Sequence, residues 1–227
     1  MTDRRYRRLG LRTDSKDFVH GAAFGPGGQT YGYVVTTWRG LSQLFPVGSL
    51  GPDDVILEYG SGMGRAAIWL ASRFPVSRVI GVEIDKDLHE VALANLERWL
   101  GPRKCSTVEF VCGDATEFQV PDDVTAIYLY NFVRGALFEK LLDRLRDSLA
   151  RRPRPLALFY FHPIMHKVLL ANGFSLERSR SNRVWVGTED EYSDAKALSP
   201  YFPPLEWAVY RWSQGTGSHG RPGTIVP

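Results

Sequence analysis

The sequence contains little cysteine, little methionine and no long hydrophobic run. Among its 227 residues are 2 cysteines, Cys105 and Cys112, without C-x-x-C spacing. We expect both to be reduced and buried, and their number excludes an iron–sulfur cluster that requires three thiolates. No apolar run reaches the length of a membrane span, and the first residues lack the hydrophobic core of a signal peptide. We therefore expect a cytoplasmic protein without a membrane partner.

The sequence also has no large excess of charge of either sign. The formal net charge is +3 and the pI is near 8.9, which is too weakly basic to indicate nucleic acid as a partner. Histidine, cysteine and carboxylate side chains show no metal-ligand spacing, so we expect no metal. The remaining composition, 44% hydrophobic and 23% charged, is that of an ordinary globular protein. The length fits one α/β domain.

The most informative stretch is VILEYGSGMG at residues 55–64. An apolar run leads to Glu58, glycine then stands at positions 60, 62 and 64, and a helical pattern follows. A buried strand that passes through a glycine turn into a helix forms the nucleotide site of many α/β sheets. A dinucleotide fingerprint places glycine at the first, third and sixth positions of the turn. Here the sixth position from Gly60 is Arg65, so the third glycine comes one residue early.

Two further motifs follow in chain order. Glu83 ends the apolar run SRVIGVE about twenty residues after the turn, where this architecture places an acid that binds ribose. Ile84 comes next, and Asp85 is expected to cap the helix that follows. The run VEFVC then ends in the turn residues 113–115, which read Gly-Asp-Ala.

This ordered series resembles the class I S-adenosylmethionine (SAM) dependent methyltransferases, whose motif I has an acid two residues before G-x-G-x-G. The resemblance implies SAM as the cofactor and S-adenosylhomocysteine (SAH) as its product. It implies that Glu83 binds the ribose hydroxyls and that Ile84 forms one wall of the adenine slot. It also implies that Asp114 accepts a hydrogen bond from the adenine amine, while a neighbouring backbone N–H reaches a ring nitrogen. The expected cofactor-binding residues are Glu58, Gly60, Ser61, Gly62, Gly64, Glu83, Ile84, Asp114, Ala115, Asn131 and Tyr31.

The resemblance also implies the fold. We expect an α/β architecture: a doubly wound, mostly parallel seven-stranded sheet with a C-terminal antiparallel hairpin and helices on both faces. The expected divisions are a basic flexible tail (1–16), an N-terminal lid or cap segment (17–50), the methyltransferase domain (51–213) and a disordered tail (214–227). Tyr31 belongs to the glycine- and aromatic-rich lid segment, which could equally cap the sheet edge or close a dimer.

Acceptor residues are expected after the fourth and fifth strands, because ligands of open α/β sheets lie beyond the carboxyl ends. The fourth strand ends in Tyr130 and Asn131, and Phe132 follows without the prolines found in methyltransferases that act on the amino groups of bases. This pattern resembles the non-SET histone-lysine methyltransferases and small bacterial relatives, in which the asparagine lines the acceptor site. His162 follows the fifth strand as a candidate general base or acceptor-orienting group, unless it only ties down its loop. The expected catalytic residues are thus Asn131, His162 and Tyr130.

These features favour a SAM-dependent methyltransferase that acts on a nitrogen or oxygen of a small molecule, for example in a biosynthetic pathway. One alternative is a protein-lysine N-methyltransferase. A second alternative is a non-catalytic SAM-binding module or an NAD-dependent oxidoreductase. No nucleic-acid partner is expected. The sequence leaves open the identity of the acceptor, the methylated element (nitrogen, oxygen or carbon) and the oligomeric state.

Overall fold

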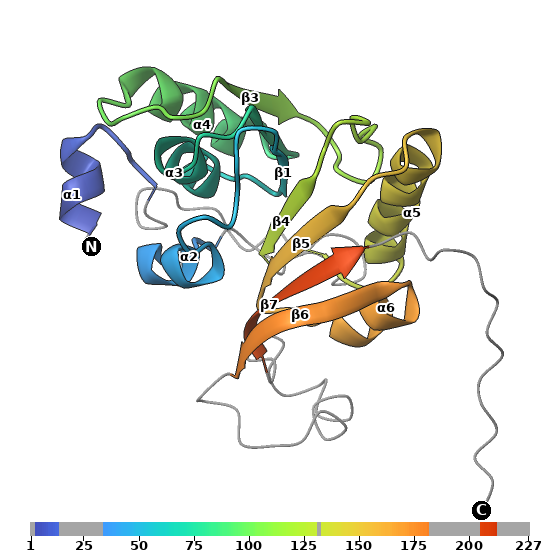
Figure 1. Ribbon diagram of the computed structural model, residues 1–227. Helices are drawn as coiled ribbons and strands as arrows, with labels where there is room; N and C mark the ends of the chain where they lie inside the picture. Colours follow the sequence, from blue (N-terminus) through green and yellow to red (C-terminus); the bar gives the residue numbers. More distant parts are fainter. Residues whose placement is uncertain (1–2, 14–33, 131–132, 182–204, 213–227) are drawn as a thin grey trace, which may run out of the picture.

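A seven-stranded sheet forms the centre of the protein in a computed structural model, which describes residues 3–13, 34–130, 133–181 and 205–212. The strands lie in the order β3-β2-β1-β4-β5-β7-β6 (Figure 1). The first five are parallel, whereas β7 runs antiparallel to both β5 and β6. Their bounds are β1 Val55–Tyr59, β2 Arg78–Glu83, β3 Thr107–Cys112, β4 Ala126–Tyr130, β5 Leu156–Phe161, β6 Phe174–Ser181 and β7 Leu205–Trp212. The sheet confirms the predicted mostly parallel architecture with a C-terminal hairpin.

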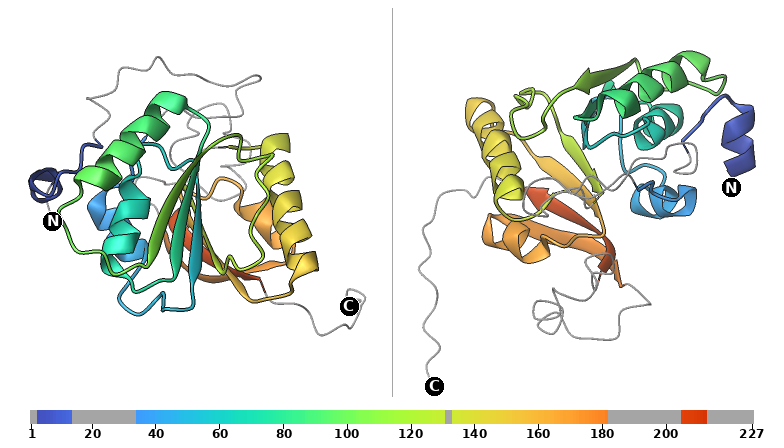
Figure 2. Two further views of the ribbon diagram at one scale, coloured as in Figure 1. Left: turned by 90° about the horizontal axis from the view of Figure 1, so that it is seen from above. Right: turned by 180° about the vertical axis from the view of Figure 1, so that it is seen from behind.

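Helices cover both faces of this sheet (Figure 2). The bounds are α1 Asp3–Arg8, α2 Trp38–Leu44, α3 Arg65–Arg73, α4 Lys86–Arg98, α5 Ala136–Arg151 and α6 His166–Ala171. Alternation along the strands supplies two apolar surfaces, so that Ile56 joins the core beneath α2 and α3, whereas Leu57 joins the core beneath α5. The predicted doubly wound arrangement is therefore confirmed.

The helices begin in different ways. Asp85 caps α4 as predicted, because its Oδ1 accepts hydrogen bonds from the backbone N–H groups of Asp87 and Leu88 at 2.9 and 3.1 Å. By contrast, α3 starts after Gly64 with no side-chain cap and with no acid in its first turn. The backbone N–H groups of the first turn of a helix have no partner within the helix. The start of α3 therefore offers donors to the carboxyl edge of the sheet.

The N-terminal residues differ from the prediction of a flexible tail. Residues 3–8 form α1, and Tyr6, Leu11 and Thr13 are buried. The ring of Tyr6 stacks on Trp38 with centroids 3.8 Å apart, and its hydroxyl accepts a hydrogen bond from Trp69 Nε1 at 3.1 Å. Apolar side chains spaced among the arginines thus fix residues 6–13 to the domain. The predicted tail at 214–227 and the first half of the predicted lid segment, residues 17–33, lie outside the described residues.

Two remaining expectations concern cysteine and membranes. Cys105 is buried, but Cys112 at the end of β3 is exposed, so the expectation that both are buried is wrong for Cys112. Within the described ranges, no helix combines the length and the apolarity that a membrane span requires.

Candidate functional site

The acids expected to bind the cofactor lie at the carboxyl edge of three neighbouring strands. Glu58 is on β1, Glu83 ends β2, and Asp114 follows β3. The order β3-β2-β1 and the parallel register, which pairs Tyr59 with Val82 and Glu83 with Cys112, bring the strand ends together. One edge of the sheet therefore collects the three acids.

The glycine turn between β1 and α3 has a backbone that favours glycine. Its glycines at 60, 62 and 64 have φ values of 71°, 52° and 77°, a region that side chains disfavour. A Cβ atom on Gly64 would also lie 2.6 Å from the Phe110 ring. The N–H groups of Gly60 and Ser61 donate to the Val82 carbonyl at 2.9 and 3.0 Å, which ties the turn to β2. The turn thus lies close against the neighbouring strand.

Glu83 links this turn to the start of α4. Its Oε2 accepts from the Gly62 N–H at 2.7 Å, and its Oε1 accepts from the Asp85 N–H at 2.9 Å. Burial raises the pKa of Glu83, while these two backbone hydrogen bonds act in the opposite direction. Each carboxylate oxygen has a second lone pair, so the group can still accept hydrogen bonds from ribose hydroxyls.

Glu58 and Ser61 have buried polar atoms without partners. Burial raises the pKa of Glu58 well above its usual value; the Ala67 backbone N–H opposes the shift, and the charge of Glu83 adds to it. Glu58 Oε2 and Ser61 Oγ make no hydrogen bond. Buried polar groups in proteins nearly always have hydrogen-bond partners. Unpaired atoms next to a glycine turn and a helix N-terminus therefore fit a site that a polar ligand completes.

The third strand end suits an adenine ring. Asp114 is exposed, and its Oδ1 accepts from the Thr116 N–H at 2.8 Å, which closes a local turn and leaves Oδ2 for another donor. Ala115 is buried next to it. Ile84, at the end of β2, has 68% of its surface exposed. An exposed apolar side chain between two acids is what an adenine slot requires as a wall.

Three aromatic side chains cluster at the carboxyl ends of β4 and β5, where the acceptor is expected. Tyr130 meets the rings of Phe161 and His162 edge-on, at centroid distances of 5.3 and 5.5 Å. Burial raises the pKa of Tyr130 to about 12 and lowers the pKa of His162 to about 4, so both are neutral at pH 7. His162 has a φ of 53°, a conformation that is uncommon for a residue with a side chain and often found at functional sites.

Two expected site residues, Tyr31 and Asn131, lie outside the described residues. Sequence reasoning also missed two polar residues next to the glycine turn, Arg65 and Asn95, which are 7% and 0% exposed. A basic residue at the first position of a helix, and an asparagine on the apolar side of α4, were the available signals. Neither signal identifies a partner, because their partners are distant in sequence.

Residues 56–152 match a protein family described as "Methyltransferase domain". The chain is 33% identical over 117 residues to a protein-lysine N-methyltransferase from Saccharolobus islandicus. The aligned region covers 51% of this chain and 71% of the relative. It is 32% identical over 82 residues to a probable ribosomal RNA small subunit methyltransferase A from Methanosarcina barkeri. That aligned region covers 36% of this chain and 26% of the relative. The chain thus spans about a quarter of that RNA methyltransferase.

A solved structure shares the fold. The precorrin-6y C5,15-methyltransferase from Geobacter metallireducens superimposes with a TM-score of 0.53 and 14% sequence identity, over 85% of this chain and 94% of the other. The methyltransferase matches replace the alternatives of a non-catalytic module and an NAD-dependent oxidoreductase. Because one relative is an RNA methyltransferase, the expectation of no nucleic-acid partner is no longer supported. The chain belongs to the class I SAM-dependent methyltransferases, and its cofactor is SAM, which methyl transfer converts to SAH.

Proposed function

We propose that the protein is an N-methyltransferase whose acceptor is the side-chain amine of a protein lysine. The match to the protein-lysine N-methyltransferase supports this acceptor, because it extends over 71% of that relative and half of this chain. The match to the RNA methyltransferase is confined to 26% of the relative. A small-molecule acceptor, which the sequence features favoured, becomes the first competing hypothesis, and RNA becomes the second.

The observation that carries the proposal is the neutral aromatic cluster of Tyr130, Phe161 and His162 at the ends of β4 and β5. A lysine side chain presents four methylene groups and an amine. Aromatic faces pack against the methylenes and attract the amine in its charged form. A histidine that stays neutral at pH 7 adds no positive charge that would repel this amine.

The transfer needs a neutral amine. Bound SAM supplies a methyl group on a sulfonium, so the nitrogen lone pair forms the new N–C bond, the C–S electron pair goes to sulfur, and one N–H proton is released. Desolvation makes His162 too weak a base to hold that proton at pH 7. Its neutral ring nitrogen orients the amine by accepting a hydrogen bond, so of the two roles expected from the sequence we propose acceptor orientation and not general base.

The proposed cofactor contacts divide along the edge. Glu83 binds the ribose hydroxyls, Asp114 and the Ala115 N–H bind adenine, and Ile84 packs against the ring. Glu58, together with the turn residues Gly60, Ser61, Gly62 and Gly64, holds the methionine part. From the sequence alone, we also propose that Tyr31 contacts the cofactor and that Asn131 lines the acceptor site.

The acceptor class is tested with labelled SAM and three separate pools from the source cell: proteins, RNA and a small-molecule filtrate. We expect label in the protein pool, with methyl-lysine recovered after acid hydrolysis and the modified residue located by mass spectrometry. Glu83→Gln should strongly reduce labelling because it weakens a cofactor contact. Glu109→Gln, a glutamate exchange on the neighbouring strand β3 away from the carboxyl edge, is the matched control and should label normally.

Label confined to the filtrate would replace lysine by a small molecule. Label confined to the RNA pool would replace it by a nucleobase or ribose. In either case the methyltransferase assignment stands, since it rests on the family and not on the acceptor.

A further inference from the structure

Two buried polar side chains join the N-terminal residues to the glycine turn. One is Asn95 on α4, and the other is Arg65, the first residue of α3. Both lie next to a loop whose glycines allow it many conformations, and neither belongs to the cofactor contacts proposed above. Their partners show what they do.

Asn95 is completely buried, and its side chain makes four hydrogen bonds, one of them a long one of 3.5 Å from Arg98 Nη2 on the same helix. Its Oδ1 accepts from the Arg12 backbone N–H at 3.0 Å, and its Nδ2 donates to the Arg12 carbonyl at 2.7 Å. Nδ2 also donates to the carbonyl of Met63, inside the glycine turn, at 2.9 Å. A single amide therefore connects the backbone at residue 12 with the backbone of the turn.

Arg65 repeats this connection from the other side of the turn. Its Nε donates to Thr13 Oγ1 at 2.8 Å, and its Nη2 donates to the Thr13 carbonyl at 3.1 Å. Nη1 lies 3.4 Å from the carbonyl of Thr36, and the guanidinium stacks 4.5 Å above the ring of Trp38. One side chain thus contacts the chain at residue 13 and again at residues 36–38.

Local structure does not account for Arg65. A cation at the first position of a helix opposes the helix dipole, and a buried guanidinium carries a desolvation penalty. The contacts that compensate it are made to N-terminal residues far away in sequence. The position directly after Gly64 is therefore used for a long-range connection at the expense of local helix stability.

We propose that Asn95 and Arg65 are positioning residues for SAM: they hold the glycine turn in its cofactor-binding conformation by attaching it to residues 12–13. Without them the turn samples conformations that do not bind, and SAM must select the competent one, so its apparent affinity falls with the competent fraction. The N-terminal residues then contribute to cofactor affinity without touching the cofactor.

Calorimetric titration of the full-length chain with SAM, and separately with SAH, tests this without knowledge of the acceptor. We expect Asn95→Leu and Arg65→Lys each to weaken SAM binding roughly tenfold or more, since each removes hydrogen bonds to the turn or to its anchor. Thr13→Val removes one acceptor of Arg65 at a distance from the turn, and it should weaken SAM binding roughly threefold. Thr13→Val and Arg65→Lys break the same contact, so the double variant should bind about as weakly as Arg65→Lys alone.

Two controls separate positioning from a general loss of stability. Arg73 is exposed in the last turn of the same helix and lies 5.9 Å above the Trp69 ring, so Arg73→Lys matches the chemistry of Arg65→Lys away from the turn. Leu145→Ala, in the core beneath α5, lowers stability on the opposite face of the sheet. Both should bind SAM as tightly as the wild type at a temperature where all variants are folded.

The proposal is overturned if Asn95→Leu and Arg65→Lys are folded and bind SAM with wild-type affinity. It is also overturned if Leu145→Ala loses affinity to the same extent at equal stability, or if the effects of Thr13→Val and Arg65→Lys simply add.

Discussion

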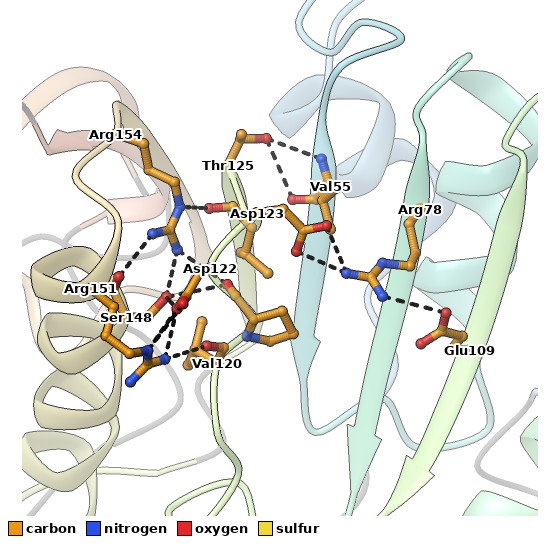
Figure 3. A network of polar contacts seen from close by, with 12 residues as sticks. Val55, Arg78, Glu109, Val120, Asp122, Asp123, Thr125, Ser148, Arg151 and Arg154 are labelled. Atoms are coloured by element: carbon orange, nitrogen blue, oxygen red, sulfur yellow. Dashed lines mark hydrogen bonds and ion pairs between the residues drawn. The ribbon is translucent and has the colours of Figure 1, made fainter.

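The amino and carboxyl edges of the sheet differ in how completely their charged groups are paired. At the amino edge, Arg78 donates to both oxygens of Asp123 at 2.8 and 2.9 Å, and Arg151 pairs with Asp122 at 2.7 Å (Figure 3). At the carboxyl edge, Glu58 is buried with an oxygen that has no partner. These two charge pairs at the amino edge are satisfied within the protein, whereas the carboxyl edge leaves hydrogen-bonding capacity for a ligand.

A cleft at the amino edge sharpens this contrast. It has a volume of about 330 Å³, and Asp123 and Arg154 are among its lining residues. Asp123 is already paired with Arg78. Arg154 donates to the carbonyls of Ser148 and Arg152 at 3.2 and 2.8 Å and to Ser148 Oγ at 2.8 Å. The contacts of Asp123 and Arg154 join the elements around this hollow, whereas unsatisfied buried polar atoms at the opposite edge indicate the ligand site.

The largest effect is expected from Glu83→Gln at the carboxyl edge. The substitution replaces the carboxylate that we propose binds the ribose hydroxyls. This carboxylate also accepts hydrogen bonds from the Gly62 and Asp85 N–H groups. Losing two charge-assisted hydrogen bonds should weaken SAM binding by about a hundredfold. Titration calorimetry measures it, with Glu109→Gln as the control. Equal affinities of the two variants would contradict the assignment of Glu83.

Arg154→Met at the amino edge should lower stability and leave SAM affinity unchanged. It leaves the Val124 carbonyl, just before β4, without its donor, and it removes one of the donors to the Pro121 and Ser148 carbonyls, so the free energy of unfolding should fall by about 2 kcal/mol. SAM affinity should not change. Urea denaturation and calorimetry measure the two quantities, and Arg152→Met, on an exposed neighbour, is the matched control. A loss of SAM affinity without a loss of stability would remove the distinction between the edges.

Glu58→Gln tests the unpaired acid. The pKa of Glu58 is raised in the folded state, so over the range between the unfolded and folded pKa values the native protein holds a proton that the unfolded chain has lost. Wild-type stability therefore falls as the pH rises through this range, and Glu58→Gln should flatten that dependence. SAM affinity should drop about tenfold, because an amide NH2 group replaces one of the two carboxyl oxygens that face the ligand. A variant with an unchanged pH dependence of stability would show that Glu58 titrates normally.

The sequence predicts the sheet well, because buried strands, glycine turns and helix caps are local signals. Residues 55–59, 78–83 and 156–161 are strands where the apolar runs indicate them, and Asp85 caps α4. Helix α1 was missed because its arginines indicate a solvated tail, whereas the packing of Tyr6 depends on Trp38 and Trp69.

The site was harder to predict than the fold, because its properties depend on contacts between residues that are distant in sequence. Arg65 meets Thr13 across 52 positions, and Asn95 meets Arg12 across 83. The low pKa of His162 comes from burial, and a sequence that shows a histidine after a strand cannot show this desolvation, so it leaves open whether the histidine is a general base or an orienting group. Residue types at strand ends are predictable; their protonation and support are not.

The smallest expected effect concerns His162, which is half-buried at the carboxyl edge and whose pKa is lowered from 6.5 to about 4 by this desolvation. Between these values the unfolded chain binds a proton that the folded protein does not, so wild-type stability is lost as the pH falls from 6.5 towards 4. His162→Gln cannot titrate and should lose less stability over this window, by under about 1 kcal/mol for a ring still partly open to solvent. Denaturation midpoints from pH 4 to 8 measure this, and His89→Gln, on the helix α4, is the matched histidine control. Because His162 is already neutral, the methylation rate should show no inflection near pH 6.5, and such an inflection, absent in His162→Gln, would restore the general base.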